Sequence, residues 1–160
     1  MQNKAIIIPG YVYHIKDKYF EVANDKMLMR NYESGAYRPT YLCLKDEKTG
    51  LHWAIPMSTR VDKYKMVVDK DVEKYGRCVK ILIARYGKKD SAFLFQNMFP
   101  ITDKYIDHLH TIGGIPATLD KNVKHEVTQG FKECRRLYKR GVKVIFTDID
   151  RLEKLMLEQR

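Results

Sequence analysis

Short apolar segments joined by tight turns fill the middle of this chain, and this feature limits its fold most. Residues 38–44 (RPTYLCL) and 51–57 (LHWAIPM) flank the connection DEKTG, and residues 79–84 (VKILIA) and 92–95 (AFLF) flank the turn GKKD. Such short connections join antiparallel neighbours, because a parallel crossover needs a dozen residues or more. The sequence therefore predicts antiparallel hairpins rather than a doubly wound parallel sheet.

The segments around these hairpins are less regular. The chain is expected to begin with a strand over residues 11–15 and a short helix over 16–25. Residues 25–37 and the basic stretch 58–78 lack a clean period and are expected to be irregular connections. Residues 96–101 are expected to add one more short strand.

The last third of the chain changes character. Apolar residues at spacings of three and four predict a long basic helix over residues 120–140. Asp120 suits its N-cap and Gly141 the position just past its C-terminus. A strand over 142–146 and a C-terminal helix capped by Thr147 are expected to follow.

This order of elements predicts an α+β fold in a single domain over residues 1–160. So few short strands enclose a core only if the sheet bends strongly, so we expect a barrel-like antiparallel sheet with packed helices. No apolar run approaches the roughly 18 residues of a membrane span. The four apolar residues in a row near the N-terminus are too few for a signal peptide, so a cytoplasmic protein without membrane contact is expected.

The charge balance points to an anionic partner. The chain has 30 Lys and Arg residues against 20 Asp and Glu, a formal net charge of +10. Its three cysteines, Cys43, Cys78 and Cys134, lie far apart, which favours free thiols over a disulfide framework or a zinc site. Nucleic acid, an anionic membrane surface or an acidic protein would each match this charge.

Several kinds of chemistry lack support in the sequence. It contains no GxGxxG, no GxxxxGK[ST], no HExxH and no carboxylate cluster for a two-metal nuclease, so no cofactor or metal is expected. His108 and His110 would share a face on a strand. They are instead expected on a helical turn, as partly exposed side chains that do not meet.

Basic residues gather in two stretches that also contain tyrosines. Residues 60–89 hold ten Lys and Arg against four Asp and Glu, and residues 121–143 hold eight against two. Cations bind phosphates and tyrosines stack on unpaired bases, a pattern that suits single-stranded RNA. The candidate RNA-binding residues are Tyr37, Lys65, Arg85, Lys88, Lys89, Lys121, Lys124, Arg135, Arg136, Lys139 and Arg140.

The segment HWAIPMSTRVDKYK, residues 52–65, is the candidate active-site segment. An apolar strand delivers two adjacent hydroxyls, Ser58 and Thr59, which are followed by Arg60 and Lys63. Hydroxyls position phosphate oxygens and cations stabilise a phosphorane, although an ordinary polar loop would look similar. Hairpin pairing of residues 38–44 with residues 51–57 should bring Arg38 beside the hydroxyls.

Three motifs resemble the endoribonuclease toxins of type III toxin–antitoxin systems, the ToxN, AbiQ and CptN kind. A basic residue, here Arg38, opens a strand. The returning strand ends in Trp53-Ala54-Ile55-Pro56-Met57-Ser58-Thr59, and a later strand ends near Asn97-Met98-Phe99-Pro100. The CptN-type branch is the most similar.

This resemblance implies a bent sheet like that of the Kid and MazF toxins. It also implies metal-free RNA cleavage by 2′-hydroxyl attack, with 2′,3′-cyclic phosphate and 5′-hydroxyl products. The partner it implies is a small structured antitoxin RNA cut from a repeat array, in place of a protein antitoxin. Such systems commonly act against phage, with cellular or phage RNA as substrate.

The resemblance also implies which residues form the site. Ser58, Thr59 and Arg38 match family positions, and Tyr32 or Tyr37 is the site tyrosine. The family's lysine two places after the hydroxyl pair is replaced here by a valine, and Arg60 or Lys63 is expected to substitute. His52 stands in place of another family lysine, either as a proton carrier or as a structural residue. The alternatives are a non-catalytic RNA-binding module and a toxin inhibited by an acidic protein.

Overall fold

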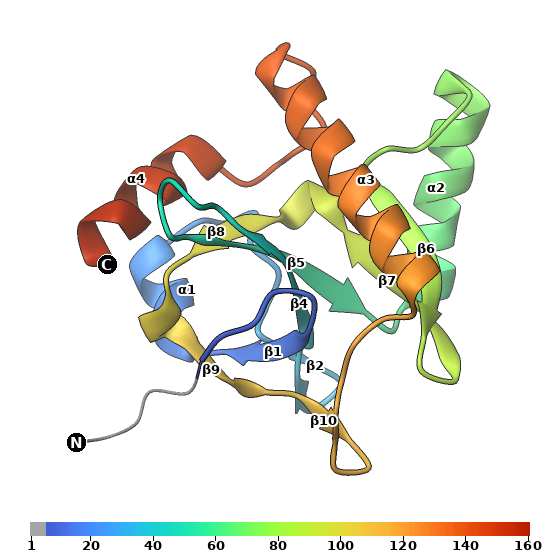
Figure 1. The fold of residues 1–160 in the computed structure, drawn as a ribbon. Helices are drawn as coiled ribbons and strands as arrows, with labels where there is room; N and C mark the ends of the chain where they lie inside the picture. Colours follow the sequence, from blue (N-terminus) through green and yellow to red (C-terminus); the bar gives the residue numbers. More distant parts are fainter. Residues whose placement is uncertain (1–5) are drawn as a thin grey trace.

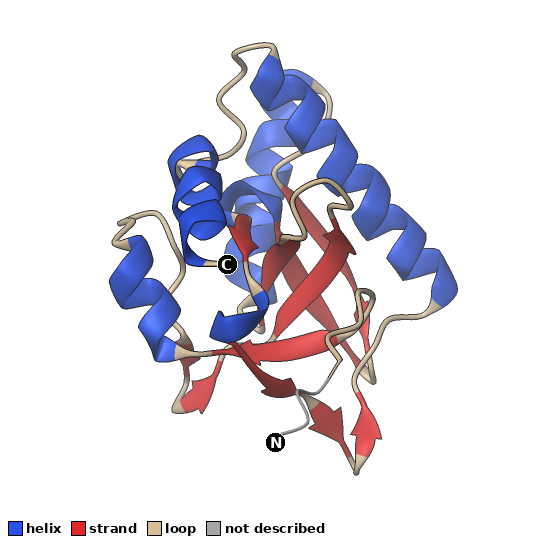
Figure 2. Cartoon of the chain, turned by 60° about the vertical axis from the view of Figure 1, so that its left-hand side comes forward, coloured by secondary structure: helices blue, strands red, loops and turns tan. Residues whose placement is uncertain are grey.

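The structure is a computed structural model that describes residues 6–160, and in it four α-helices surround a curved sheet (Figure 1). The helices are α1 (Asp17–Ala23), α2 (Val61–Tyr75), α3 (Lys121–Lys139) and α4 (Ile149–Gln159). The strands of the sheet are β1 (Val12–Ile15), β4 (Thr40–Lys45), β5 (His52–Ser58), β6 (Ile81–Tyr86), β7 (Lys89–Leu94), β8 (Phe99–Ile101) and β9 (Ile106–Leu109). Figure 2 shows the helices gathered toward the top of the view and most of the strands below them.

Two separate ribbons of two strands complete the fold. They are β2 (Tyr32–Glu33) with β3 (Ala36–Tyr37), and β10 (Thr111–Ile112) with β11 (Ile115–Pro116). Every strand pair is antiparallel. The predicted α+β class and antiparallel sheet are therefore confirmed.

The sheet is curved but does not close. Its order is β6-β7-β5-β4-β1-β9, with β8 on the second edge of β5, and within residues 6–160 the end strands β6 and β9 do not pair. The barrel-like part of the prediction is therefore not supported. The likeness to Kid and MazF stays a prediction.

Strand β5 organises the sheet because it changes partners along its length. One edge pairs with β4 from His52 to Pro56, while the other pairs first with β8 and then, from Met57, with β7. A proline is expected at the exit or the edge of a sheet strand, yet Pro56 lies inside β5. It falls between the two partners on that second edge, so its missing N–H removes no ladder bond there.

Helices cover the sheet on different sides and bury three clusters. Helix α3 packs Val127 and Phe131 against Trp53, whereas α1 and α4 pack Tyr19 and Met156 in a second cluster. The third cluster, under α2, is small and includes Tyr64, Ile81, Ala92 and Leu94. No helix within residues 6–160 is long and apolar enough to cross a membrane.

Two segments expected to be irregular are regular. Residues 61–75 form α2, which the sequence conceals because Tyr64 is its one buried side chain. Residues 32–37 form the β2–β3 hairpin, whose turn residues Ser34 and Gly35 both have positive φ, 53° and 83°. A two-residue turn of this kind matches the twist of a hairpin.

The C-terminal expectations need two corrections. Residues 142–146 form no strand, although Val144 and Ile145 are buried. Thr147 does not cap α4, because its hydroxyl donates to the buried Met98 carbonyl at 2.5 Å. Asp148 is the cap, and its carboxylate accepts from the Arg151 N–H.

Candidate active site

The β2–β3 hairpin carries the residue that organises the site, Glu33. Its carboxylate accepts hydrogen bonds from the Ser58 hydroxyl at 2.7 Å, the Thr59 hydroxyl at 2.5 Å and the Thr59 N–H at 2.8 Å. Arg38 donates a further bond to the same carboxylate at 2.7 Å. We call these four groups the donor set, and they confirm that the β4–β5 hairpin brings Arg38 beside the hydroxyl pair.

The donor set keeps Glu33 ionised. Partial burial on its own would raise the pKa of this carboxyl group, but the bonds from Thr59, Ser58 and Arg38 lower it to about 2. A carboxylate with so low a pKa is a poor proton acceptor at neutral pH. Glu33 therefore acts as a bound anion, and the donor set around it is an anion-binding site.

Arg38 is fixed from several sides. Its side chain is buried, with Nε donating to the Arg30 carbonyl at 2.7 Å and Nη1 also donating to the Met57 carbonyl at 3.0 Å. A guanidinium held in this way keeps its direction when another anion replaces Glu33.

A pocket of about 450 Å³ opens beside the donor set. Its lining includes Tyr32, Glu33, Arg38, Arg60, Lys63 and Tyr64. Arg60 and Lys63 stand at the start of α2 and are exposed. Tyr64 is buried, and this burial raises the pKa of its phenol.

Both candidate tyrosines lie at the hairpin. Tyr32 and Tyr37 pair across it with ring centroids 4.4 Å apart, and the Tyr32 hydroxyl donates to Asp17 at 3.1 Å. Hydrogen bonding to Tyr37 and Asp17 raises the pKa of Tyr32. Tyr32 lines the pocket, so the structure brings together Ser58, Thr59, Arg38, Arg60, Lys63 and Tyr32.

His52 is not brought to this pocket. It begins β5 while Ser58 ends it, so about 20 Å of strand separates them. Its side chain is fully buried, with Nε2 2.9 Å from a carboxylate oxygen of Asp103, and burial lowers its pKa. His52 is therefore placed as a structural residue.

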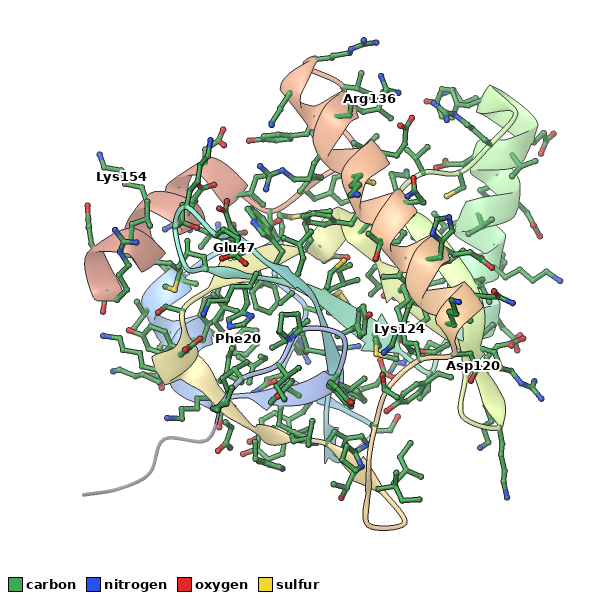
Figure 3. All side chains as sticks on the ribbon, viewed as in Figure 1. Phe20, Glu47, Asp120, Lys124, Arg136 and Lys154 are labelled. Atoms are coloured by element: carbon green, nitrogen blue, oxygen red, sulfur yellow. The ribbon has the colours of Figure 1, made fainter. Side chains whose placement is uncertain are left out.

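The candidate RNA-binding residues are spread over three surfaces. Arg85, Lys88 and Lys89 are exposed on the β6–β7 hairpin, and Lys65 on α2. The remaining cations lie on α3 or just past its end. Figure 3 shows Lys124 near the N-terminal end of α3, close to Asp120, and Arg136 toward its other end.

Two of the α3 cations already have partners. Arg135 stacks on Trp53, with its guanidinium carbon 4.1 Å from the ring centroid. Arg136 pairs with Glu133 at 2.7 Å. Lys121, Lys139 and Arg140 are exposed, so the solvated part of the basic face is smaller than the sequence suggests.

The histidines lie differently from the prediction. Segment 106–109 is the strand β9, not a helical turn, so His108 and His110 both reach His14 on β1. The His14 ring stacks on His108 with centroids 4.4 Å apart, and its Nε2 lies 2.7 Å from His110 Nδ1. Even so, no group of three or more His, Cys, Asp or Glu residues within 6–160 is placed to hold a metal ion.

Sequence reasoning missed Glu33 and Tyr64. Glu33 precedes Ser34-Gly35, a pair that is a turn signal when it separates two short strands. Tyr64 lies in the segment that conceals α2. Recognising either element would have pointed to these residues.

Comparison with solved structures finds a likeness of fold to the toxins that the sequence motifs resemble. No model of a known protein family matches the chain, and neither does any curated protein. Among solved structures, AbiQ, a lactococcal anti-phage endoribonuclease of a type III toxin–antitoxin system, matches at TM-score 0.66 and 14% identity over 93% of this chain and 97% of its own. A structure of bacterial type III toxin inhibition by a non-coding RNA pseudoknot matches at TM-score 0.63 and 15% identity, over 95% and 98%.

These matches run over nearly the whole length of both chains. The resemblance to the type III toxins, expected from three short motifs, is therefore confirmed as a likeness of fold. The assignment to the CptN-type branch stays a prediction.

Proposed function

We propose that this protein is a metal-independent endoribonuclease toxin of a type III toxin–antitoxin system. One observation carries the proposal: Arg38, Ser58 and Thr59 aim four donors at one carboxylate, beside a pocket lined by cations. A carboxylate and a phosphodiester both present two anionic oxygens to such donors. The likeness to AbiQ, an endoribonuclease, supports RNA as the substrate.

In this proposal the scissile phosphate of single-stranded RNA replaces Glu33 in the donor set. The 2′-oxygen attacks phosphorus, the P–O5′ bond breaks, and the products are a 2′,3′-cyclic phosphate and a 5′-hydroxyl. Ser58, Thr59 and Arg38 stabilise the charge that develops on the phosphorane. Arg60 and Lys63 add positive charge from α2.

The chemistry also needs proton transfer. The 2′-proton passes to a general base and the leaving 5′-oxygen takes a proton from a donor. The Glu33 carboxylate is unsuited to the first role, because its pKa is about 2 while the donor set holds it. The proton donor in this proposal is one of the proton-bearing side chains that line the pocket, Tyr32, Lys63 or Tyr64.

The partner proposed for this toxin is a small, structured, repeat-derived RNA that neutralises it in the cytoplasm. The support is the inhibition of a toxin of the same fold by a non-coding RNA pseudoknot. The exposed cations of α3 and of the β6–β7 hairpin supply the wide basic surface that a folded RNA needs. Action against phage follows from the likeness to AbiQ.

The test uses purified protein, single-stranded RNA and excess EDTA. We expect cleavage at an unchanged rate in EDTA, with 2′,3′-cyclic phosphate ends identified by mass spectrometry. The double substitution Ser58→Ala, Thr59→Ala should lower the rate by roughly 10²- to 10³-fold or more, as loss of oxyanion donors does.

Thr111→Ala, which removes an exposed hydroxyl on β10, is the matched control and should keep full activity. RNA binding without cleavage by the unmodified protein would overturn the proposal in favour of a non-catalytic RNA-binding module. Activity lost in EDTA and restored by added metal would refute the mechanism.

A further inference from the structure

Four rings from four strands form a continuous row beside the donor set. Tyr32 contacts Tyr37 at 4.4 Å between centroids, Tyr37 meets the edge of His14 at 5.9 Å, and His14 stacks on His108 at 4.4 Å. The planes of the two imidazoles are nearly parallel, 9° apart. We call these four residues the ring row.

The ring row is open to solvent. Tyr32 is 48% exposed, Tyr37 is 40% exposed, and the side chain of His108 is 62% exposed. Folded chains usually bury large rings, so rings left uncovered in a connected group mark a binding surface. Flat, uncovered rings are the platforms on which unpaired nucleobases stack.

The row begins at the site where the phosphate is proposed to bind. Tyr32 directly precedes Glu33 and lines the pocket beside the donor set, so the first ring of the row and the carboxylate belong to one surface. The row continues from Tyr32 through Tyr37 to His14 and His108 by the ring contacts given above. An RNA strand that places its phosphate in the donor set can therefore reach the row at Tyr32.

The charges around the row distinguish bases from phosphates as its ligand. Burial and the neighbouring His108 and His110 lower the pKa of His14, against an opposing effect of Asp107. Asp17 accepts from the Tyr32 hydroxyl, and Asp107 lies 3.6 Å from the His108 ring. Two carboxylates beside these rings disfavour a phosphate there and suit an uncharged base.

We propose that the ring row is a nucleobase-binding site for the single-stranded RNA whose phosphate occupies the donor set. This rests on the proposed function and extends it, because it assigns the bases of the substrate to the surface that continues from Tyr32 away from the donor set. His108 and Tyr37 carry the stacking. His14 positions the His108 ring by stacking on it.

The experiment measures the affinity of the whole protein for a single-stranded RNA that carries 2′-O-methyl groups and is therefore not cleaved. His108→Ala and Tyr37→Leu are tested at pH 8, where an ordinary imidazole is neutral. Each should weaken binding roughly 5- to 150-fold, the range for removal of one stacking ring, and leave the salt dependence unchanged. A 2-aminopurine base in the RNA, whose fluorescence is quenched by stacking, should lose that quenching.

His125→Ala is the matched control, because this exposed histidine on α3 lies outside the row. An abasic oligomer of the same length should bind the wild type and the ring variants equally. Equal affinity of wild type and both ring variants for the base-containing RNA would overturn the inference while leaving cleavage intact. Failure of the wild type to bind single-stranded RNA would remove both proposals.

If the wild type binds but does not cleave, the proposed catalysis falls and the base-binding site stands on the affinity data. A weaker salt dependence in His108→Ala would instead show a phosphate contact and overturn the base assignment. Circular dichroism establishes that each variant is folded.

Discussion

The two ends of β5 offer a direct comparison, because each buries a polar residue with opposite consequences. At the C-terminal end, Ser58 is 2% exposed and donates to Glu33 beside an open pocket. At the N-terminal end, His52 is fully buried and meets Asp103. Ser58 is hydrogen-bonded within the protein, whereas neither ring nitrogen of His52 makes a hydrogen bond of good geometry, although Nε2 lies 2.9 Å from Asp103. A pocket of about 390 Å³ also opens at the N-terminal end, lined by Lys45 and Asp103, but His52 does not line it.

The difference lies in what a ligand could replace. Glu33 lies on the β2–β3 hairpin, and a phosphate could take over the contacts that its carboxylate makes with the donor set. His52 lies between Lys45 on β4 and Ile101 on β8, and its side chain is fully buried, so a ligand cannot reach it without a rearrangement of its surroundings. An internal partner therefore marks a site only where its place can be taken from outside.

Replacing the internal anion should have the largest effect. Glu33→Gln removes a negative charge from the place proposed for phosphate, so RNA affinity should rise by at least about tenfold. The control is Glu47→Gln in the exposed loop between β4 and β5, labelled in Figure 3, which should change affinity little. Unchanged affinity in Glu33→Gln would show that phosphate does not compete with Glu33.

The same variant has a pH signature. Because the donor set lowers the Glu33 pKa from 4.5 to about 2, the folded state gains stability from the carboxylate above pH 4.5. That gain disappears as the pH falls toward 2. The difference in free energy of unfolding between wild type and Glu33→Gln should therefore be largest near neutral pH and shrink through this range in urea titrations.

At the other end of β5, His52→Gln should reduce stability and leave cleavage per folded molecule unchanged. A loss of about 1–3 kcal/mol at pH 7 is expected, because a buried polar contact is disturbed. Burial lowers the His52 pKa below 6.5, so the unfolded chain binds the proton more readily and the wild type loses this stabilisation as the pH falls. The difference in free energy of unfolding between the two proteins should therefore be smaller at pH 5 than at pH 7. A folded His52→Gln protein that does not cleave RNA would show that His52 belongs to the active site.

The sequence was sufficient for the part of the site that hairpin geometry controls. Pairing of residues 40–45 with residues 52–56 brings Arg38 to the hydroxyl pair, and short connections are enough to predict it. Pairing of the longer strands does not reach Glu33, because this residue lies on a separate hairpin whose strands have only two residues each, too short for an apolar pattern. The Ser34-Gly35 turn signal is the one local indication of that hairpin.

The remaining differences between prediction and structure have separate causes. Helix α2 has only one buried side chain, so its apolar period is weak, and tertiary contacts with β6 and β7 determine it instead. For His52 the resemblance left both a proton carrier and a structural residue open, and the full burial of its side chain favours the second. The curvature of the sheet was expected and its open edge was not, because closure depends on pairing between strands distant in sequence.

The smallest effects are expected from substitutions on α3 and at its end. They should distinguish exposed cations from a cation that packs on the core. Lys139→Ala with Arg140→Ala removes exposed charges and should leave stability unchanged. If both residues bind phosphates of a structured RNA, the slope of log affinity against log salt should fall by roughly 0.7–0.9 for each phosphate that is no longer neutralised. The proposed antitoxin RNA would then bind more weakly and leave more toxin free, so its co-expression should no longer protect cells fully.

Arg135→Ala should behave in the opposite way. Its guanidinium covers the Trp53 ring, so its removal should reduce stability by about 0.5–1 kcal/mol and change the salt slope less than removal of Lys139 and Arg140. Thermal unfolding and salt titrations of RNA binding, run on both variants, separate the two roles. Equal slopes of log affinity against log salt in the two variants and the wild type would show that this end of α3 is a solvated face. The surface proposed for the antitoxin RNA would then have to lie on α2 or the β6–β7 hairpin.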